Sequence, residues 1–181
     1  MEFTLYYRGP LKSNGGRDEK HRLRQYFHKQ LKKLWNQLPL SEQSYLLYDP
    51  GPYAVSAIKG VGAFRFASLV NKSLHLIAEL RITLLQPGQP GFIKGGDVDN
   101  RLKTLFDALR VPEESELPNN VQPGPEENPF FCLLEDDKLI TSISVATDRL
   151  LDPSANEDEV VLLLHVQTKV TKATNENLAL L

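Results

Sequence analysis

The sequence has a single cysteine, Cys132, and no apolar run that approaches the roughly 18 residues of a transmembrane helix. One cysteine excludes an intrachain disulfide and a zinc site built from the cysteines of one chain. Cys132 lies within the apolar run of residues 130–134, which favours a buried structural thiol over a nucleophile. The N-terminus also lacks the basic start and apolar core of a secretory signal, so we expect a cytoplasmic protein without membrane contacts.

A strong net charge of either sign is also missing. The 181 residues include 21 basic and 23 acidic side chains, a net charge of −2. Residues 1–36 hold nine of the basic and three of the acidic residues, a net charge of +6, which leaves −8 for residues 37–181. This distribution excludes a surface covered throughout with DNA-binding charge. Contact with phosphates is expected to be local, or to depend on an oligomer that brings two basic N-terminal regions together.

The hydrophobic pattern predicts two amphipathic helices and a small set of strands. Apolar residues at three- and four-residue steps predict helices over residues 18–36 and 98–110. Strands are predicted over residues 3–7, 64–70, 74–85, 143–151 and 160–169. The turn residues 71–73 suggest a hairpin between the second and third of these strands. The order of elements predicts one α+β domain over residues 1–181, with a small mixed β-sheet and two main helices packed on it.

Three further segments are less regular. Residues 40–47 are compatible with a short helix. Residues 111–129 are polar, acidic and rich in proline and asparagine, which predicts an exposed, mobile loop. The residues from about 173 onward are expected to form a C-terminal tail.

The segment with the most chemical information is residues 95–103, with the sequence GGDVDNRLK. Asp97 and Asp99 stand two residues apart where a loop meets the predicted second helix. Two carboxylates this close resist ionising together unless a cation neutralises them. Mg²⁺ is the natural cation, because it is hard and is often held by few carboxylates together with water and phosphate. Helix caps also produce such acidic pairs, so the pair alone is weak evidence for a metal site.

Neighbouring residues strengthen the metal interpretation. Lys103 lies one helical turn after Asp99, where it can stabilise negative charge on a metal-bound phosphate. The alternative for Lys103 is a helix ion pair with Asp99 or Asp107, and Asp107 is the better candidate for a purely structural role. Residues 135–137, Glu-Asp-Asp, stand between apolar residues, which is unusual for a plain surface turn. One or two of these acids are expected to complete the metal site.

Together these residues resemble the signature of the RusA family of Holliday-junction resolvases. The matching positions are Asp97-Val98-Asp99-Asn100, Lys103, Phe106-Asp107-Ala108-Leu109 and Asp136-Asp137. The close match covers about a quarter of the chain, and the order of elements is similar over most of it. The resemblance implies a homodimeric, Mg²⁺-dependent endodeoxyribonuclease that cleaves branched DNA at Holliday junctions, with Mn²⁺ as a substitute metal.

The resemblance also implies roles for single residues. Asp97, Asp99 and Asp137 would be the metal-binding catalytic acids, and Lys103 would be the catalytic lysine. Asp136 occupies the position of the paired acid and would share in holding the metal.

Basic residues of the first predicted helix and beside the acidic segment are candidate contacts to DNA phosphates. They are Lys20, Arg24 and Lys29 of the first predicted helix, together with Lys94 and Arg101. The alternative for the helix residues is a solvated surface without a ligand.

The chain departs from the family pattern in its length, its slight acidity and two additional segments, residues 39–66 and 111–129. These departures leave the acidic site intact but leave the substrate open. One alternative is a nuclease of the same fold that acts on flaps or RNA. Another is a non-catalytic DNA- or protein-binding module in which the acids are only helix caps.

Overall fold

The computed structural model describes residues 1–49, 55–87, 97–156 and 159–180, with the side chain of Asp97 excluded. The strands and main helices are β1 (Glu2–Pro10), α1 (Arg17–Trp35), β2 (Ile58–Val61), β3 (Phe64–Val70), β4 (Leu76–Gln86), α2 (Asp97–Leu109), β5 (Phe130–Leu134), β6 (Ile140–Arg149) and β7 (Glu159–Val170). Four short 3-10 helices are η1 (Leu40–Leu47), η2 (Glu114–Glu116), η3 (Asp137–Leu139) and η4 (Leu178–Leu180). The predicted α+β class is confirmed.

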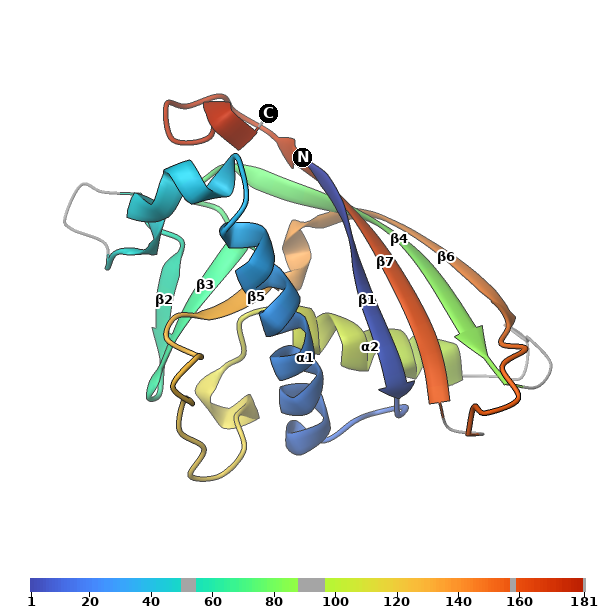
Figure 1. Cartoon of the computed structure of the whole chain (residues 1–181). Helices are drawn as coiled ribbons and strands as arrows, with labels where there is room; N and C mark the ends of the chain where they lie inside the picture. Colours follow the sequence, from blue (N-terminus) through green and yellow to red (C-terminus); the bar gives the residue numbers. More distant parts are fainter. Residues whose placement is uncertain (50–54, 88–96, 157–158, 181) are drawn as a thin grey trace.

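The strands form two sheets rather than one. The larger sheet has the order β1–β7–β4–β6 and the smaller one the order β2–β3–β5. In the larger sheet β7 is antiparallel to β1 and to β4, whereas β6 is parallel to β4. Figure 1 shows the four-stranded sheet on one side, the smaller sheet on the other, and α1 and α2 between them.

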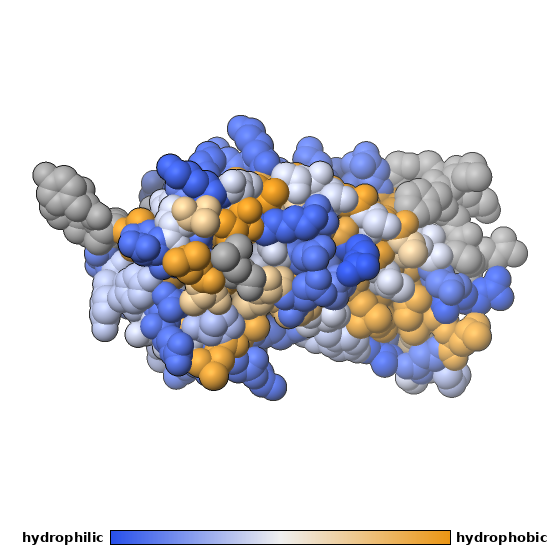
Figure 2. All heavy atoms as spheres, turned by 90° about the horizontal axis from the view of Figure 1, so that it is seen from above, coloured by the Kyte–Doolittle hydropathy of each residue, from blue (hydrophilic) through white to orange (hydrophobic). Residues whose placement is uncertain are grey.

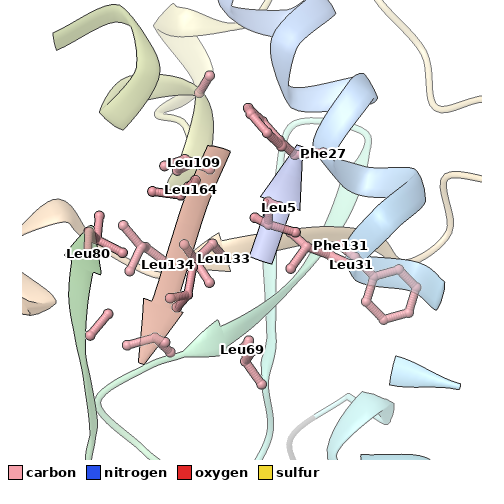
Figure 3. Close-up of a cluster of buried hydrophobic side chains, with 14 of the residues drawn as sticks. Leu5, Phe27, Leu31, Leu69, Leu80, Leu109, Phe131, Leu133, Leu134 and Leu164 are labelled. Atoms are coloured by element: carbon pink, nitrogen blue, oxygen red, sulfur yellow. The ribbon is translucent and has the colours of Figure 1, made fainter. Parts of the chain in front are cut away.

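The core lies where these layers meet. Along β7, Leu162 and Leu164 are buried while Leu163 between them is 40% exposed, as expected for a strand with one covered face. Figure 3 shows Leu164 in the same cluster as Phe27 of α1 and Leu109 of α2. Each fully buried leucine or phenylalanine side chain contributes about 1.5–3 kcal/mol to folding, so this cluster fixes α1 and α2 against the sheet.

The outer surface mixes apolar with polar side chains. Figure 2 shows hydrophobic residues scattered among hydrophilic ones on the face seen from above. Single exposed apolar residues of this kind are normal for folded proteins and define no site by themselves. Among the described residues, no helix has both the length and the apolar character needed to span a membrane.

The predicted hairpin between β3 and β4 is wrong, because the two strands belong to different sheets. The turn between them redirects the chain instead of reversing it within one sheet. The Asn71 side chain holds this turn: it donates to the carbonyl of Ser68 at 2.9 Å and accepts from the amide of Leu74 at 2.8 Å. The pairing of β3 with β5, a strand that the hydrophobic pattern did not predict, takes the place of the expected hairpin.

The acidic segment of residues 111–129, expected to be mobile, is tied to its surroundings. Leu117 is buried in a small cluster with Phe64 and Phe130. Glu113 forms a capping box with Glu116 around η2. Further along, the segment contacts α1 through an ion pair between Glu126 and Lys32. Its acidic residues therefore act largely as caps and ion-pair partners.

The expected C-terminal tail also folds back onto the protein. The buried side chain of Asn177 donates to the carbonyl of Leu74 at 2.8 Å and to that of Lys172 at 2.9 Å. Leu180 in η4 is buried in the main core.

The single cysteine, Cys132, is buried, as the sequence predicted, and burial raises the pKa of its thiol to about 12.

His28 of α1 forms hydrogen bonds with the segment that precedes β5 and with β5 itself. Its Nε2 lies 3.0 Å from the carbonyl oxygen of Glu126, and the amide of Phe131 donates to its Nδ1 at 2.9 Å. An amide can only donate, so Nδ1 must be unprotonated and the ring neutral. Burial lowers the pKa of His28, in agreement with this geometry.

We expect the free energy of unfolding to decrease as the pH falls below about 6.5, the ordinary histidine pKa. The reason is that the unfolded chain takes up a proton that folded His28 resists. His21, whose pKa burial also lowers, adds an effect of the same sign. Denaturant titrations at pH 7.5 and 5.5 measure the difference. His28→Asn keeps an acceptor for the Phe131 amide without a titrating ring, so its smaller pH dependence is the control; an equal dependence would contradict the assignment.

Candidate functional site

The acidic residues predicted for the site lie at the start of α2 and in the turn before β6. Asp99 and Lys103 are exposed on the same face of α2, whereas Leu105 and Leu109 on its other face are buried in the core. Asp137 begins η3 and is also exposed. The amphipathic pattern of α2 therefore determines which residues of the acidic segment face solvent.

These two elements meet at one hollow. Asp99, Lys103 and Asp137 line an open hollow of about 410 Å³, together with the side chains of Leu102, Phe106, Asp107 and Ile143. The structure thus brings together two of the three predicted catalytic acids and the predicted catalytic lysine from distant parts of the sequence. The side chain of Asp97 and all of Lys94 lie outside the described residues.

Asp99 and Asp137 offer carboxylate oxygens at this hollow, and such oxygens are the ligands that Mg²⁺ prefers. Among the described side chains, which exclude Asp97, no group of three or more acidic, histidine or cysteine residues is arranged to hold a metal ion. Asp99 and Asp137 are two members of the predicted ligand set, to which Asp97 and Asp136 also belong.

Asp136 is placed differently from Asp137. Its Oδ1 caps η3 by accepting from the amide of Lys138 at 3.0 Å. This hydrogen bond is the main reason why the pKa of Asp136 is lowered. Asp136 lines a second hollow rather than the one with Asp99, whereas Asp137 lines both. Of the paired acids, Asp137 is therefore better placed to share a cation with Asp99.

The second hollow, of about 520 Å³, adjoins the first at Asp137 and extends to the turn after β2. Its lining has both signs of charge. Lys59 and Lys138 are exposed cations, and acidic neighbours include Glu113 and Glu135. The sequence interpretation did not identify either lysine, because the strand that carries Lys59 was not recognised and Lys138 is an ordinary residue beside acids.

Asp107 forms ion pairs within the fold, as the structural role predicted for it requires, but its partners are Lys20 and Arg110 rather than Lys103. Its carboxylate lies 2.7 Å from Nζ of Lys20 and 3.1 Å from Nη2 of Arg110. Burial acts to raise the pKa of Asp107, but these two cations outweigh burial and leave the pKa lowered. Within the described part of the chain, Lys103 forms an ion pair with neither Asp99 nor Asp107, which leaves its ammonium group available at the hollow.

Arg24 was predicted to contact DNA, and that prediction is wrong. Arg24 is 1% exposed, and its Nη2 donates to the carbonyl of Asp107 at 2.9 Å. Burial lowers the pKa of Arg24 to about 10. Arg24 lies on the side of α1 that contacts α2, where its stem packs in the core while Nη2 bonds to backbone. Lys20 is committed to Asp107, whereas Lys29 remains exposed.

Arg101 follows Asp99 in α2 and is half-buried. Its guanidinium group lies 3.5 Å from the side-chain oxygen of Gln86 at the end of β4. The structure therefore places Arg101 against the sheet rather than fully in solvent.

The loop before α1 fixes the position of α2. The amide of Gly15 donates to Oγ1 of Thr104 at 2.9 Å, and Thr104 donates to the carbonyl of Asn100 at 3.1 Å. A Cβ atom on Gly15 would lie 2.7 Å from Cγ2 of Thr104 and 2.9 Å from Cγ of Glu19. Gly15 therefore permits a close approach to the helix next to Lys103.

We expect Gly15→Ala to lower the free energy of unfolding by about 1–3 kcal/mol, the usual cost of forcing an extra methyl group into a packed site. Gly60→Ala is the matched control, because a Cβ atom at Gly60 would meet nothing within 4 Å. Equilibrium unfolding in denaturant measures both variants. Equal stability of the two would mean that the contact between Gly15 and Thr104 does not hold the helix.

Comparisons of the chain with protein-family models, curated proteins and solved structures gave no match.

Proposed function

We propose that the protein is a Mg²⁺-dependent endodeoxyribonuclease that acts on branched DNA, with Holliday junctions as the expected substrate. One observation supports this proposal above the others: Asp99, Lys103 and Asp137 line the same hollow. These are residues to which the resemblance assigns metal binding and catalysis. Helix caps alone would not require a lysine and an acid from a distant turn at the same hollow.

In this proposal Asp99 and Asp137, with Asp97, hold the metal and orient the scissile phosphate. Bound Mg²⁺ would polarise this phosphate and lower the pKa of the attacking water. The oxygen of that water forms the new bond to phosphorus as the bond to the leaving oxygen breaks. Lys103 stabilises the negative charge that builds up during this step. Leu102 and Phe106 supply an apolar wall of the hollow.

DNA on either side of the scissile phosphate would contact cations near the hollow. Lys138 and Lys59 of the adjoining hollow are exposed. Lys29 is exposed on α1 but lines neither hollow. The acids of the adjoining hollow limit its attraction for phosphates, so metal-free binding should be weak and sensitive to salt.

The test is a cleavage assay on four-way junction, flap, duplex and RNA substrates, each with and without Mg²⁺. The proposal expects metal-dependent cleavage with the junction preferred. A preference for flaps or RNA would keep the nuclease and change its substrate. Binding without metal-dependent cleavage of any of them would instead identify a non-catalytic binding module.

Crystals grown with Mn²⁺ should show the ion about 2.0–2.6 Å from carboxylate oxygens of at least two of Asp97, Asp99 and Asp137. The anomalous signal of manganese identifies the ion directly. Crystals of Asp99→Asn grown in the same way are the control and should show a weaker signal. An ordered site in which the carboxylates of Asp97 and Asp137 lie more than about 8 Å apart would rule out a shared set of ligands at these short distances.

A further inference from the structure

The turn that carries Asp137 crosses from one sheet to the other. β5 ends at Leu134 in the smaller sheet, and β6 begins at Ile140 in the larger one. Residues 71–75, between β3 and β4, make the same crossing. β3 is parallel to β5, and β4 is parallel to β6. The two turns therefore lie beside each other, because the strands that enter them are neighbours and so are the strands that leave them.

Glu135 joins these two turns. Its amide donates to the carbonyl of Val70 at 2.8 Å, and its Oε2 accepts from the amide of Lys72 at 2.9 Å. The turn that receives these bonds is itself fixed, since the buried side chain of Asn71 forms hydrogen bonds across it. The backbone and the carboxylate of Glu135 thus both hold the start of the acidic turn against a rigid neighbour.

The three consecutive acids differ in what their carboxylates contact. Glu135 is half-buried and lines the second hollow, whereas Asp137 is exposed and also lines the hollow with Asp99. Asp136, between them, accepts from the amide of Lys138 and caps η3. Two of the three carboxylates are therefore bonded to backbone amides on either side of Asp137, and the third is left for the candidate site.

We propose that Glu135 is a positioning residue for Asp137, an inference that rests on the proposed function. The Glu135 carboxylate acts as a hydrogen-bond acceptor and not as a ligand of the metal. Its bond to the amide of Lys72 restrains the backbone two residues before Asp137. Without this bond the turn has more freedom, so Asp137 spends less time where it can share a cation with Asp99. Groups that orient metal ligands in this way contribute about 10–100-fold to metal affinity.

The test is the binding of Mn²⁺ without nucleic acid, with free Mn²⁺ measured by electron paramagnetic resonance. Glu135→Ala removes the acceptor and should weaken binding by about 10–100-fold. Glu135→Gln keeps an oxygen for the Lys72 amide and loses only the charge, so it should stay within about fivefold of the wild type, the scale of one exposed charge. The same acid-to-amide change at a ligand, Asp137→Asn, should weaken binding at least as much as Glu135→Ala does.

Glu114→Ala is the matched control. Glu114 is an exposed acid that lines the second hollow, and within the described residues its carboxylate bonds to neither turn. This variant loses the same charge from the same hollow, so it should bind Mn²⁺ within about fivefold of the wild type. Thermal unfolding confirms that every variant is folded at the temperature of the titration.

Hydrogen exchange of the Lys72 amide, followed by NMR without metal, gives a second readout. Exchange should be faster in Glu135→Ala than in the wild type, because the amide loses its acceptor, and Glu135→Gln should restore much of the protection. This measurement tests the hydrogen bond separately from the metal.

Wild-type Mn²⁺ affinity in Glu135→Ala would overturn the positioning role. Equal losses in Glu135→Ala and Glu135→Gln would also overturn it, since the charge and not the acceptor would then be required. Metal-dependent cleavage of DNA together with wild-type affinity in Glu135→Ala would remove the positioning role and keep the nuclease. Affinities in the expected order in a protein that cleaves nothing would do the reverse. A wild type that binds no Mn²⁺ would overturn both.

Discussion

Asp99→Asn should abolish Mg²⁺-dependent cleavage of junction DNA while leaving metal-free binding of the same DNA intact or stronger. The substitution removes one negative charge at nearly constant shape. A carboxylate that holds the metal is then lost, and with it the polarisation of the phosphate and the activation of water. Without metal, the same change removes repulsion between a carboxylate and the DNA phosphates, so affinity should not fall.

The same result is expected for Asp97→Asn and Asp137→Asn, because all three acids are proposed to hold the metal. Asparagine also caps helices well, so activity would survive if the acids were only caps. Asp18→Asn is the control, since Asp18 is an exposed acid in the first turn of α1, as Asp99 is near the start of α2. Wild-type cleavage rates in Asp97→Asn and Asp99→Asn would end the metal-nuclease proposal.

Thermal unfolding without metal gives a second measurement on the same variants. Exposed carboxylates that gather at one hollow repel one another, so each asparagine should leave the melting temperature unchanged or raise it. A large decrease would instead indicate that Asp99 or Asp137 stabilises the fold. The structure gives neither residue an ion-pair partner within its described part, in contrast to Asp107.

The local elements of the fold could be predicted from the sequence because their causes are local. The predicted helices over residues 18–36 and 98–110 differ by one residue at each end from α1 and α2. Helical periodicity depends only on the spacing of apolar residues. The shared face of Asp99 and Lys103 was predictable for the same reason, since the two residues lie one helical turn apart in α2.

Long-range pairing could not be predicted in this way. Periodicity predicts strands over residues 64–70 and 74–85 but not which strands lie beside them. The short turn between them favoured a hairpin, whereas β3 pairs with β5 and β4 pairs with β6, both in parallel. Parallel partners are separated by long connections, and no local pattern identifies them.

Arg24, the buried cation of α1, illustrates a second limit of prediction from the sequence. Arg24 looked like a surface residue because arginine is mostly exposed in proteins. Its burial follows from the contact between α1 and α2, where the backbone of Asp107 accepts its hydrogen bond. The partner of Lys20 is likewise a residue of the other helix. Which charges of a helix face solvent thus depends on what packs against it.

Lys103→Ala should lower the rate of Mg²⁺-dependent cleavage by about 10²-fold or more, the scale of losing one electrostatic donor to a transition state. Its effect on junction affinity should be small, because the ammonium group acts on charge that develops during the reaction. Within the described residues Lys103 forms no ion pair, so alanine should also leave the melting temperature nearly unchanged. The measurements are single-turnover cleavage rates, binding without metal and thermal unfolding.

Two variants separate a role in catalysis from a role in folding. Lys103→Arg keeps the positive charge at the hollow and should recover part of the lost rate. Asp107→Asn breaks the contacts to Lys20 and Arg110, so it should lower the melting temperature while reducing the cleavage rate of the folded protein far less than Lys103→Ala does. If Lys103→Ala instead lowered the melting temperature and kept the cleavage rate, Lys103 would be a structural residue of α2. The charge that stabilises the transition state would then have to come from elsewhere in the hollow.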